Sequence, residues 1–404
     1  MVPQLGGRVM QLTFGNHPYL FVNPQLKGKY FPPSNAAETG KWFNYGGDKI
    51  WPLPEGSEDA QHWPGPISDA LDDGDYDFKV LSQHAVCTVR LEGPADPRTG
   101  LQYSREVSLG SDSPEVSFHA VMKNATDHPI RWSMQSVTQY DTASPVSPNA
   151  YNRDFWAFTP INPNSAYDDG YRVRLGLSND PAYSVKDGWF ALHWLYFERE
   201  VWLDSPGGWL AVVDGSTRYA MLERFPHPDA EYPGKATVIF YTNGPALEFD
   251  DKGMASLTSS NPADNPYYME AEVNSPMVAL KPGEAYALDT KWFPTRLGRR
   301  PESVTEAGVT ASGLTASKSR NGVLLSGSFG VFFPGNLTAY LFDGEGVRTG
   351  IVPLQTVSPF DIVDLHKEVP ASPSIARISI HLIDARGIDR GSLGEASIKA
   401  DHGP

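Results

Sequence analysis

The chain has 404 residues, enough for two or three domains of about 150 residues each. Its 33 Lys and Arg against 48 Asp and Glu give a formal net charge of −15, which argues against nucleic acid and membrane as partners because both require a basic face. The 10 Trp, 18 Tyr and 19 Phe predict a globular chain, not an acidic disordered one. The single cysteine, Cys87, excludes a disulfide framework and a cysteine-built metal site.

The N-terminal residues show no basic segment followed by an apolar one, so no signal peptide is predicted. Strand-like residues Val9–Thr13 follow Gly6-Gly7 directly, and a second short strand, Tyr19–Val22, follows the turn at 15–18. A hairpin this close to the first residue usually has another strand before it, and we therefore expect a leading strand to precede residue 1. The sequence leaves the location of the protein undecided. The chain as written would be cytoplasmic, whereas a chain with an additional N-terminal segment would be periplasmic or secreted.

Short alternating runs of apolar and polar residues recur along the chain, for example at 85–91, 116–122 and 237–241. This period of two predicts antiparallel strands with one buried face, and the 37 Gly and 35 Pro suit many turns. Two stretches, 40–78 and 141–188, are dense in Trp, Gly and Pro and are interpreted as functional loops. The predicted fold class is all-β, without a membrane-spanning segment.

The composition changes near residue 298, which predicts a domain over 1–297, a linker over 298–307 and a second domain over 308–404. Within the second domain, Leu-Phe-Asp at 341–343 recurs as Leu-Ile-Asp at 382–384, each followed by two glycines at the same spacing. The echo predicts two hairpins with the same turn chemistry in a small β-sandwich. The alternative is a pair of unrelated Asp/Gly turns.

Several motifs along 1–297 occur in a characteristic order. They are Gly-Gly-Arg-Val-Met-Gln-Leu at 6–12, Gly46–Pro52, Tyr103–Val107, and the Glu-x-Glu strand Tyr268–Val273 followed by Leu-x-Pro-Gly-Glu at 280–284. Together they resemble a bacterial branch of the galactose-mutarotase-like superfamily, which includes the aldose 1-epimerases. The resemblance implies a large antiparallel β-supersandwich with a concave, carbohydrate-binding face, and makes the C-terminal sandwich an accessory domain.

The same resemblance implies proton transfer at a sugar's anomeric centre, which needs a carboxylate as base and an acid, usually histidine. Glu270 and Glu272 are two residues apart on a predicted strand, so both side chains point to one face. The resemblance makes Glu272 the candidate base, with Glu270 as the second choice. The alternative is that both are solvated charges on an outer face.

The acid is less evident from the sequence. Where the family motif has its histidine, after an Asn-x-Thr turn, this chain has Gln135 or Ser136, and neither acts as a general acid near neutral pH. Ordinary aldose epimerisation is therefore in doubt. His193, between Leu192 and Trp194, is the remaining candidate acid or sugar-facing donor; a histidine bonded by backbone is the alternative. Gln135 is kept as a candidate substrate-binding residue.

Aromatic and charged side chains gather in the first loop-rich stretch. Sugars stack their C–H faces on aromatic rings and need polar partners for their hydroxyls. The candidate substrate-binding residues are Trp42, Trp51, Trp63, Asp48 and Lys49, joined by Arg105 from a later strand. Tryptophans that fix a loop to the sandwich are the alternative for the aromatic residues. Lys49 and Arg105 are candidates to meet the carboxylate of an acidic sugar, or to pair with an acid of their own protein.

Other chemistries lack their motifs. The sequence has no Gly-x-Ser-x-Gly elbow, phosphate loop, dinucleotide fingerprint or His-Glu-x-x-His helix. The acidic run at 72–77 is a candidate calcium site, although it lacks the spaced Glu of an EF-hand. The alternative is a solvated acidic turn. No other cofactor is predicted.

The sequence thus predicts a carbohydrate-active protein with epimerase-like, hydrolase or lyase chemistry, or a non-catalytic glycan-binding module. Hydrolysis is geometrically open because it needs two carboxylates about 5–10 Å apart.

Overall fold

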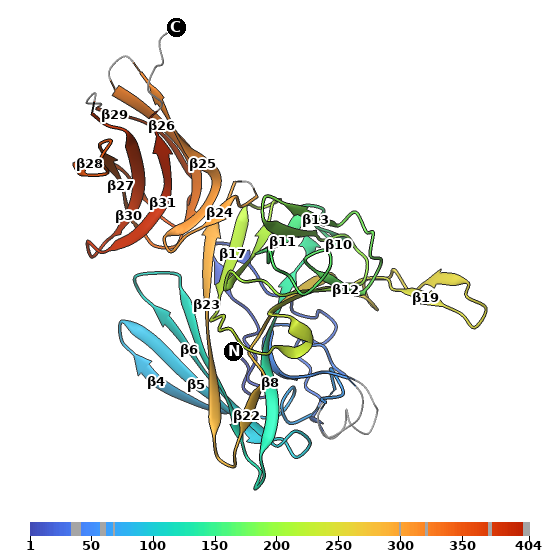
Figure 1. Ribbon diagram of the computed structural model, residues 1–404. Helices are drawn as coiled ribbons and strands as arrows, with labels where there is room; N and C mark the ends of the chain where they lie inside the picture. Colours follow the sequence, from blue (N-terminus) through green and yellow to red (C-terminus); the bar gives the residue numbers. More distant parts are fainter. Residues whose placement is uncertain are drawn as a thin grey trace. The chain divides into compact units, whose positions relative to one another are not determined.

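The computed structural model describes residues 1–33, 42–56, 62–67, 69–298, 300–319, 322–370 and 374–398. The chain divides into two compact units. The first holds Met1–Leu109, Val116–Val212 and Glu223–Trp292, and the second holds Gly110–Glu115, Val213–Leu222 and Phe293–Pro404. The described elements are strands, joined by turns and by a 3₁₀ turn, η1, at Pro233–Lys235, so the predicted all-β class is confirmed (Figure 1).

A seven-stranded antiparallel sheet carries the candidate site of the first unit. Its order is β12 (Arg172–Leu175), β15 (Arg199–Leu203), β18 (Val238–Thr242), β21 (Tyr268–Asn274), β8 (Ile130–Asp141) and β22 (Val278–Leu280), with β3 (Asp48–Leu53) also paired to β8. Strand β15 illustrates why these residues form a sheet. Its Val201 and Leu203 are buried while Glu200 and Trp202 are half-buried, so alternate residues face opposite sides.

A ten-stranded antiparallel sheet forms the second layer. Its order is β13 (Tyr183–Lys186), β14 (Trp189–His193), β11 (Phe155–Pro160), β16 (Trp209–Asp214), β17 (Tyr219–Arg224), β23 (Ala285–Arg296), β7 (Val116–Asn124), β6 (Leu101–Gly110), β5 (Val86–Ala95) and β4 (Asp77–Gln83). A buried apolar cluster joins the two sheets, with Trp132 and Met134 of β8 packed among Tyr103 of β6 and Met122 of β7. The first unit is therefore a sandwich whose core lies between two sheets.

The segments predicted as loops or N-terminal strands differ in detail. The stretch 141–188 contains β9 (Ala143–Ser144), β10 (Ser147–Tyr151), β11, β12 and β13, and the stretch 40–78 contains β3 and the start of β4. Near the N-terminus, the strands are reduced to a hairpin of β1 (Thr13–Phe14) and β2 (His17–Pro18) with isolated bridges at Val9, Leu20 and Val22. Frequent Pro and Gly shorten these strands, so sequence patterning does not separate them from loops.

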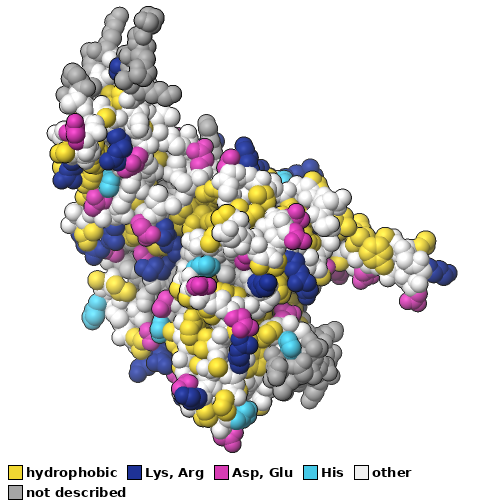
Figure 2. Space-filling model, viewed as in Figure 1, with side chains coloured by type: hydrophobic (Ala, Val, Ile, Leu, Met, Phe, Trp, Pro, Cys, Tyr) yellow, Lys and Arg dark blue, Asp and Glu magenta, His cyan; other side chains and the backbone are white. Residues whose placement is uncertain are grey.

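A further hairpin of the first unit is formed by β19 (Leu247–Phe249) and β20 (Ala255–Leu257). Figure 1 shows this hairpin with the label β19. Its residues Phe249, Met254 and Leu257 are exposed. Elsewhere on the face seen in Figure 2, acidic and basic side chains are interspersed and do not gather into one basic surface. Within the described residues, no helix has the length and apolar character that crossing a membrane requires.

The second unit has two four-stranded sheets. One has the order β24 (Ser303–Val304), β25 (Gly308–Lys318), β26 (Gly322–Val331), β29 (Val363–Pro370), and the other β28 (Arg348–Val357), β27 (Gly335–Phe342), β30 (Arg377–Asp384), β31 (Asp389–Ser397). The segment predicted as a linker, 298–307, is not a free connection, because its β24 pairs with β25. The C-terminal segment of this unit begins at Phe293, before the predicted linker.

The two turns of the sequence echo have the same hydrogen bonding. Asp343 Oδ1 accepts from the backbone N–H groups two and four residues later, and Asp384 Oδ1 does the same. The strands that precede the turns, β27 and β30, pair with each other in one sheet. The predicted pair of hairpins with common turn chemistry is confirmed, because an Asp that caps its own turn needs only local sequence.

One carboxyl of the first unit is buried between the sheets. Glu223 of β17 is 1% exposed, and Tyr140 of β8 donates a 2.5 Å hydrogen bond to its Oε1. Burial raises the pKa of Glu223 to about 8, and the hydrogen bond from Tyr140 only partly opposes this effect. The folded protein therefore holds a proton on Glu223 that the unfolded chain releases near pH 4.5.

The stability of the first unit is expected to fall as the pH rises from about 4.5 to 8, because the unfolded chain ionises Glu223 in this range whereas the folded state keeps it protonated. Each unit of pKa difference corresponds to about 1.4 kcal/mol. Glu223→Gln should flatten this dependence because glutamine does not titrate. Its amide oxygen can still accept the hydrogen bond from Tyr140. Urea unfolding between pH 5 and 9 measures the effect, with exposed Glu248→Gln as the control. Equal pH profiles for Glu223→Gln and the wild type would contradict the assignment.

Candidate functional site

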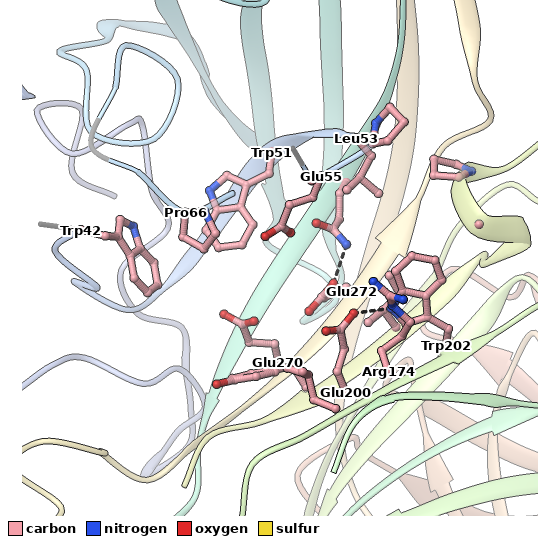
Figure 3. Close-up of a pocket in the computed structure, with 18 of the residues that line it drawn as sticks. Trp42, Trp51, Leu53, Glu55, Pro66, Arg174, Glu200, Trp202, Glu270 and Glu272 are labelled. Carbon is pink, nitrogen blue, oxygen red and sulfur yellow. Dashed lines mark hydrogen bonds between the residues drawn. The ribbon is translucent and has the colours of Figure 1, made fainter. Parts of the chain in front are cut away.

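A pocket of about 360 Å³ opens on one face of the seven-stranded sheet (Figure 3). Strands β3, β8, β12, β15, β18 and β21 all contribute to it, together with residues that follow β3. The lining residues are Trp42, Trp51, Leu53, Pro54, Glu55, Gly56, Pro66, Gln135, Arg174, Leu175, Glu200, Trp202, Pro233, Gly234, Ile239, Tyr241, Tyr268, Glu270 and Glu272. Four of these residues are glutamates and five are aromatic.

Strand register places these side chains in two rows across the sheet. In one row, Glu200 lies opposite Tyr241, which lies opposite Glu270. In the other, Trp202 lies opposite Ile239, which lies opposite Glu272. Residues directly opposite each other on antiparallel strands share a face, so the pairing of β15, β18 and β21 brings the three carboxyls to one surface.

Glu270 and Glu272 are on the floor of the pocket, each 6% exposed. Gln135 of β8 donates to Glu272 through its side-chain amide, and Gln139 donates to Glu270 Oε1 at 2.5 Å. Burial raises the pKa of Glu272 well above its usual value, and the negative charge of Glu270 raises it further. The two carboxyls predicted to share a strand face do so, on the pocket side and not as a solvated outer face.

Lys49 of β3 is buried beside Glu270. Its Nζ is 3.5 Å from Glu270 Oε1 and 4.2 Å from the centre of the Trp51 ring. Burial lowers the pKa of Lys49, an effect that the charge of Glu270 opposes. The sequence left two roles for Lys49, contact with an acidic sugar or pairing with an acid of its own protein. The structure shows the second, with Glu270 as the partner.

Asp48 and Arg105 lie outside the pocket lining. They form an ion pair buried between the sheets. Thr138 also donates to Asp48 at 3.0 Å, and the Arg105 guanidinium lies 4.3 Å from the Phe118 ring centre. Asp48 is adjacent to Lys49 on β3, and adjacent residues of a strand face opposite sides. The predicted substrate contacts of Asp48 and Arg105 are therefore replaced by a pair inside the core.

The three tryptophans of the first loop-rich stretch do not form one group. Trp42 and Trp51 line the pocket, and their indole N–H groups donate to the two oxygens of Asp72 at 2.8 and 2.6 Å. Trp63 is fully buried and donates to Asp69 at 2.9 Å. Trp63 therefore fixes the loop to the core, whereas the other two combine that role with a place in the pocket wall.

The acidic run predicted as a calcium candidate is tied to protein groups at its start. Arg8, itself fully buried, lies 2.8 Å from Asp72 Oδ2 and 3.2 Å from Asp73 Oδ1. A guanidinium already compensates these two charges. Within the described ranges, no group of three or more His, Cys, Asp or Glu side chains has the arrangement of a metal site.

The structure does not bring His193 to the glutamate pair. His193 is on β14 of the ten-stranded sheet, where its Nε2 lies 2.8 Å from the Arg153 carbonyl oxygen and its ring stacks on Trp156 at 3.9 Å. As acid and base of one reaction, His193 and Glu272 would both have to contact the same ligand. The two residues lie in different sheets. His193 corresponds to the alternative, a histidine bonded by backbone.

Several pocket residues were not anticipated from the sequence: Glu55, Arg174, Glu200, Trp202 and Tyr241. Trp202 donates its indole N–H to Glu200, and the Arg174 guanidinium lies 5.0 Å from the Trp202 ring centre. Burial raises the pKa of Glu200. Loss of hydration raises the pKa of Glu55, at the exposed rim, to about 7, and the charges of Glu200 and Glu270 add to this. The alternation Arg-Glu-Val-Trp at 199–202 carried the signal that Glu200 and Trp202 share a face.

Comparison with known proteins finds no matching family model and no matching curated protein, but it finds similar solved structures. A TPR-domain containing protein from Parabacteroides distasonis is 16% identical with a TM-score of 0.46; the match covers 72% of this chain and only 44% of that longer protein. The Slr1438 protein from Synechocystis is 11% identical over 73% of this chain and 91% of its own, with a TM-score of 0.47.

A galactose mutarotase-like protein from Clostridium acetobutylicum is 12% identical over 74% of this chain and 92% of its own, with a TM-score of 0.44. All three matches concern fold, and the function proposed below is drawn from the side chains of the pocket.

Proposed function

We propose that the pocket binds a carbohydrate and that Glu270 and Glu272 exchange protons with it. The observation that carries this proposal is the pair of buried carboxyls two residues apart on β21, at the floor of a pocket with Trp51 and Trp202 in its lining. Aromatic rings offer stacking faces to the C–H surfaces of a sugar, and carboxylate oxygens accept hydrogen bonds from its hydroxyls. Figure 3 shows both kinds of group around one space.

The glutamate pair is suited to general acid–base chemistry. Glu272 has a raised pKa, caused by burial and by Glu270, and it therefore keeps a proton to higher pH than an ordinary carboxyl. Two like charges this close do not ionise independently, so one carboxyl can donate a proton while the other accepts one. At an anomeric centre, this pair would protonate the ring or leaving oxygen and deprotonate a hydroxyl or water.

The acid in this proposal is a carboxyl, not a histidine. Aldose epimerisation through this pair and hydrolysis of a glycosidic bond are both compatible with two carboxyls on one strand face, since residues two apart are about 6.5–7 Å apart along the backbone. Elimination from a uronate is less well supported. It needs a cation that neutralises the uronate, whereas Lys49 pairs with Glu270 and Arg105 with Asp48. The lining cation that is left, Arg174, lies over Trp202 and shares the pocket with four carboxyl groups.

A non-catalytic glycan-binding module is the second candidate. It is favoured by the position where the family resemblance implies a histidine, which holds Gln135 or Ser136 in this chain; Gln135 donates its amide N–H to Glu272. Such a protein would keep the aromatic lining and the acceptors of the pocket without turnover. A pH-dependent rate separates the two candidates, because a pure binder has no rate to titrate.

Trp202→Ala is expected to weaken carbohydrate binding at least about tenfold, since a lost stacking face costs about 1.4 kcal/mol or more. Ligand-observed NMR with a panel of mono- and oligosaccharides identifies the bound sugar, and calorimetry then measures the affinity. Trp156→Ala is the matched control: it also removes a half-buried strand tryptophan, but on the other sheet. Absence of binding by every sugar, or equal losses in both variants, would contradict the proposal.

A further inference from the structure

Building on the proposed function, we propose that this pocket selects an amino sugar, a saccharide with a free ammonium group, over neutral and acidic sugars. Four carboxyl groups belong to the pocket lining, those of Glu55, Glu200, Glu270 and Glu272. Figure 3 shows them directed into the same space, from a loop after β3 and from strands β15 and β21. A cationic group in this space would meet four carboxyl groups, and its positive charge would favour their ionised form.

The cations near these carboxyls do not neutralise them all. Lys49 is buried, paired with Glu270 and in contact with the Trp51 ring. Arg174 is an exposed residue whose guanidinium lies over Trp202. Two cations against four acids leave the pocket acidic, and the low dielectric around buried groups makes that excess costly without a positive ligand.

Apart from the Arg174 guanidinium, hydrogen-bond donors in the pocket wall are mostly already used by the protein. Those of Gln135 and Trp202 go to Glu272 and Glu200, those of Trp42 and Trp51 go to Asp72, and the Tyr241 hydroxyl donates to Glu198. Gln139, which is outside the pocket lining, donates to Glu270. One hydrogen-bond acceptor of a residue that contacts Glu270 has no donor among the described residues. Gln139 Oε1 is fully buried and has no hydrogen-bond partner in the described part of the chain.

An ammonium group matches this arrangement, because it brings three N–H donors, no acceptor and a positive charge. A sugar hydroxyl brings one donor and adds an acceptor of its own. A uronate brings further negative charge and would be repelled. The raised pKa values of Glu55, Glu200 and Glu272 result partly from mutual repulsion, so an ammonium ligand should lower them and release protons to the buffer.

The test compares matched ligands by calorimetry at a pH where the amine is protonated. Glucosamine, galactosamine and mannosamine are titrated beside their N-acetyl forms and the parent hexoses. At least one amino sugar is expected to bind ten times or more tightly than both its N-acetyl form and its parent hexose. Its binding should weaken with added salt, and its heat should vary with buffer ionisation because protons are released.

Glu200→Gln, which removes one of the four charges at a half-buried position, is expected to reduce the preference for the amino sugar by several fold. Glu248→Gln, at an exposed position of β19, is the matched control and should leave the preference intact. Binding of neutral sugars with no preference for any amino sugar overturns this inference and leaves the proposed function standing. Absence of binding across both this panel and the oligosaccharides overturns the proposed function as well.

Discussion

Glu272→Gln is expected to slow proton transfer at the anomeric centre by about 10²- to 10⁴-fold, the usual contribution of a positioned acid or base. Glutamine keeps the shape of the side chain and a carbonyl oxygen that accepts from Gln135, but it carries no transferable proton. One-dimensional proton NMR of α-glucose and α-galactose, followed by the amino sugars, measures anomer equilibration with and without protein.

Two comparisons make this experiment decisive. His193→Gln should equal the wild type, because His193 lies on β14 and bonds the Arg153 carbonyl, away from the pocket lining. Glu272→Gln with wild-type rates would contradict the assignment of Glu272. If the wild type accelerates no sugar, including glycosidic substrates, the proton-transfer half of the proposal fails and the glycan-binding module takes its place.

Arg105→Met is expected to destabilise the first unit by about 3–5 kcal/mol, because it leaves Asp48 as an uncompensated charge in the core. Asp48 is fully buried. Burial raises its pKa, and the principal opposing influence is the charge of Arg105, followed by hydrogen bonds from Arg105 and Thr138. Urea unfolding, with tryptophan fluorescence as the probe, measures the change.

The double variant Asp48→Leu/Arg105→Met tests the same interpretation. Replacing both partners of a buried ion pair by apolar groups is often neutral or stabilising, so the double variant should recover most of the stability lost in the single one. Carbohydrate binding by the folded protein should be unchanged in both. If Arg105→Met lowers the free energy of unfolding by less than about 1 kcal/mol, or selectively weakens sugar binding, the interpretation is contradicted and Arg105 is again a candidate ligand contact.

Local sequence is sufficient for features that depend on one strand or one turn. Glu270 and Glu272 share a face because side chains alternate along any extended strand, and the sequence predicts this whatever the strand pairs with. Asp343 and Asp384 make the same turn because each caps backbone N–H groups of its own turn. The all-β class follows in the same way, from period-two alternation and turn residues.

Tertiary structure alone decides which side chains meet. Trp51 enters the pocket wall because β3 pairs with β8 opposite Gln135, whereas nearby Trp63 turns into the core toward Asp69. Glu200 and Glu272 are 72 positions apart in the chain, and they reach one surface only through β18 between them. Asp48 and Arg105 pair across the two layers, and His193 is carried away on the other sheet.

The physical reason is that alternation sets the direction of a side chain relative to its own strand, whereas strand order and register set its neighbours. Order and register depend on packing summed over both sheets, and no short segment encodes them. The sequence by itself therefore determined the strand class, the paired glutamates and the repeated turns. Only the tertiary structure decided that four carboxyls share one pocket and that Arg105 and Asp48 belong to the core.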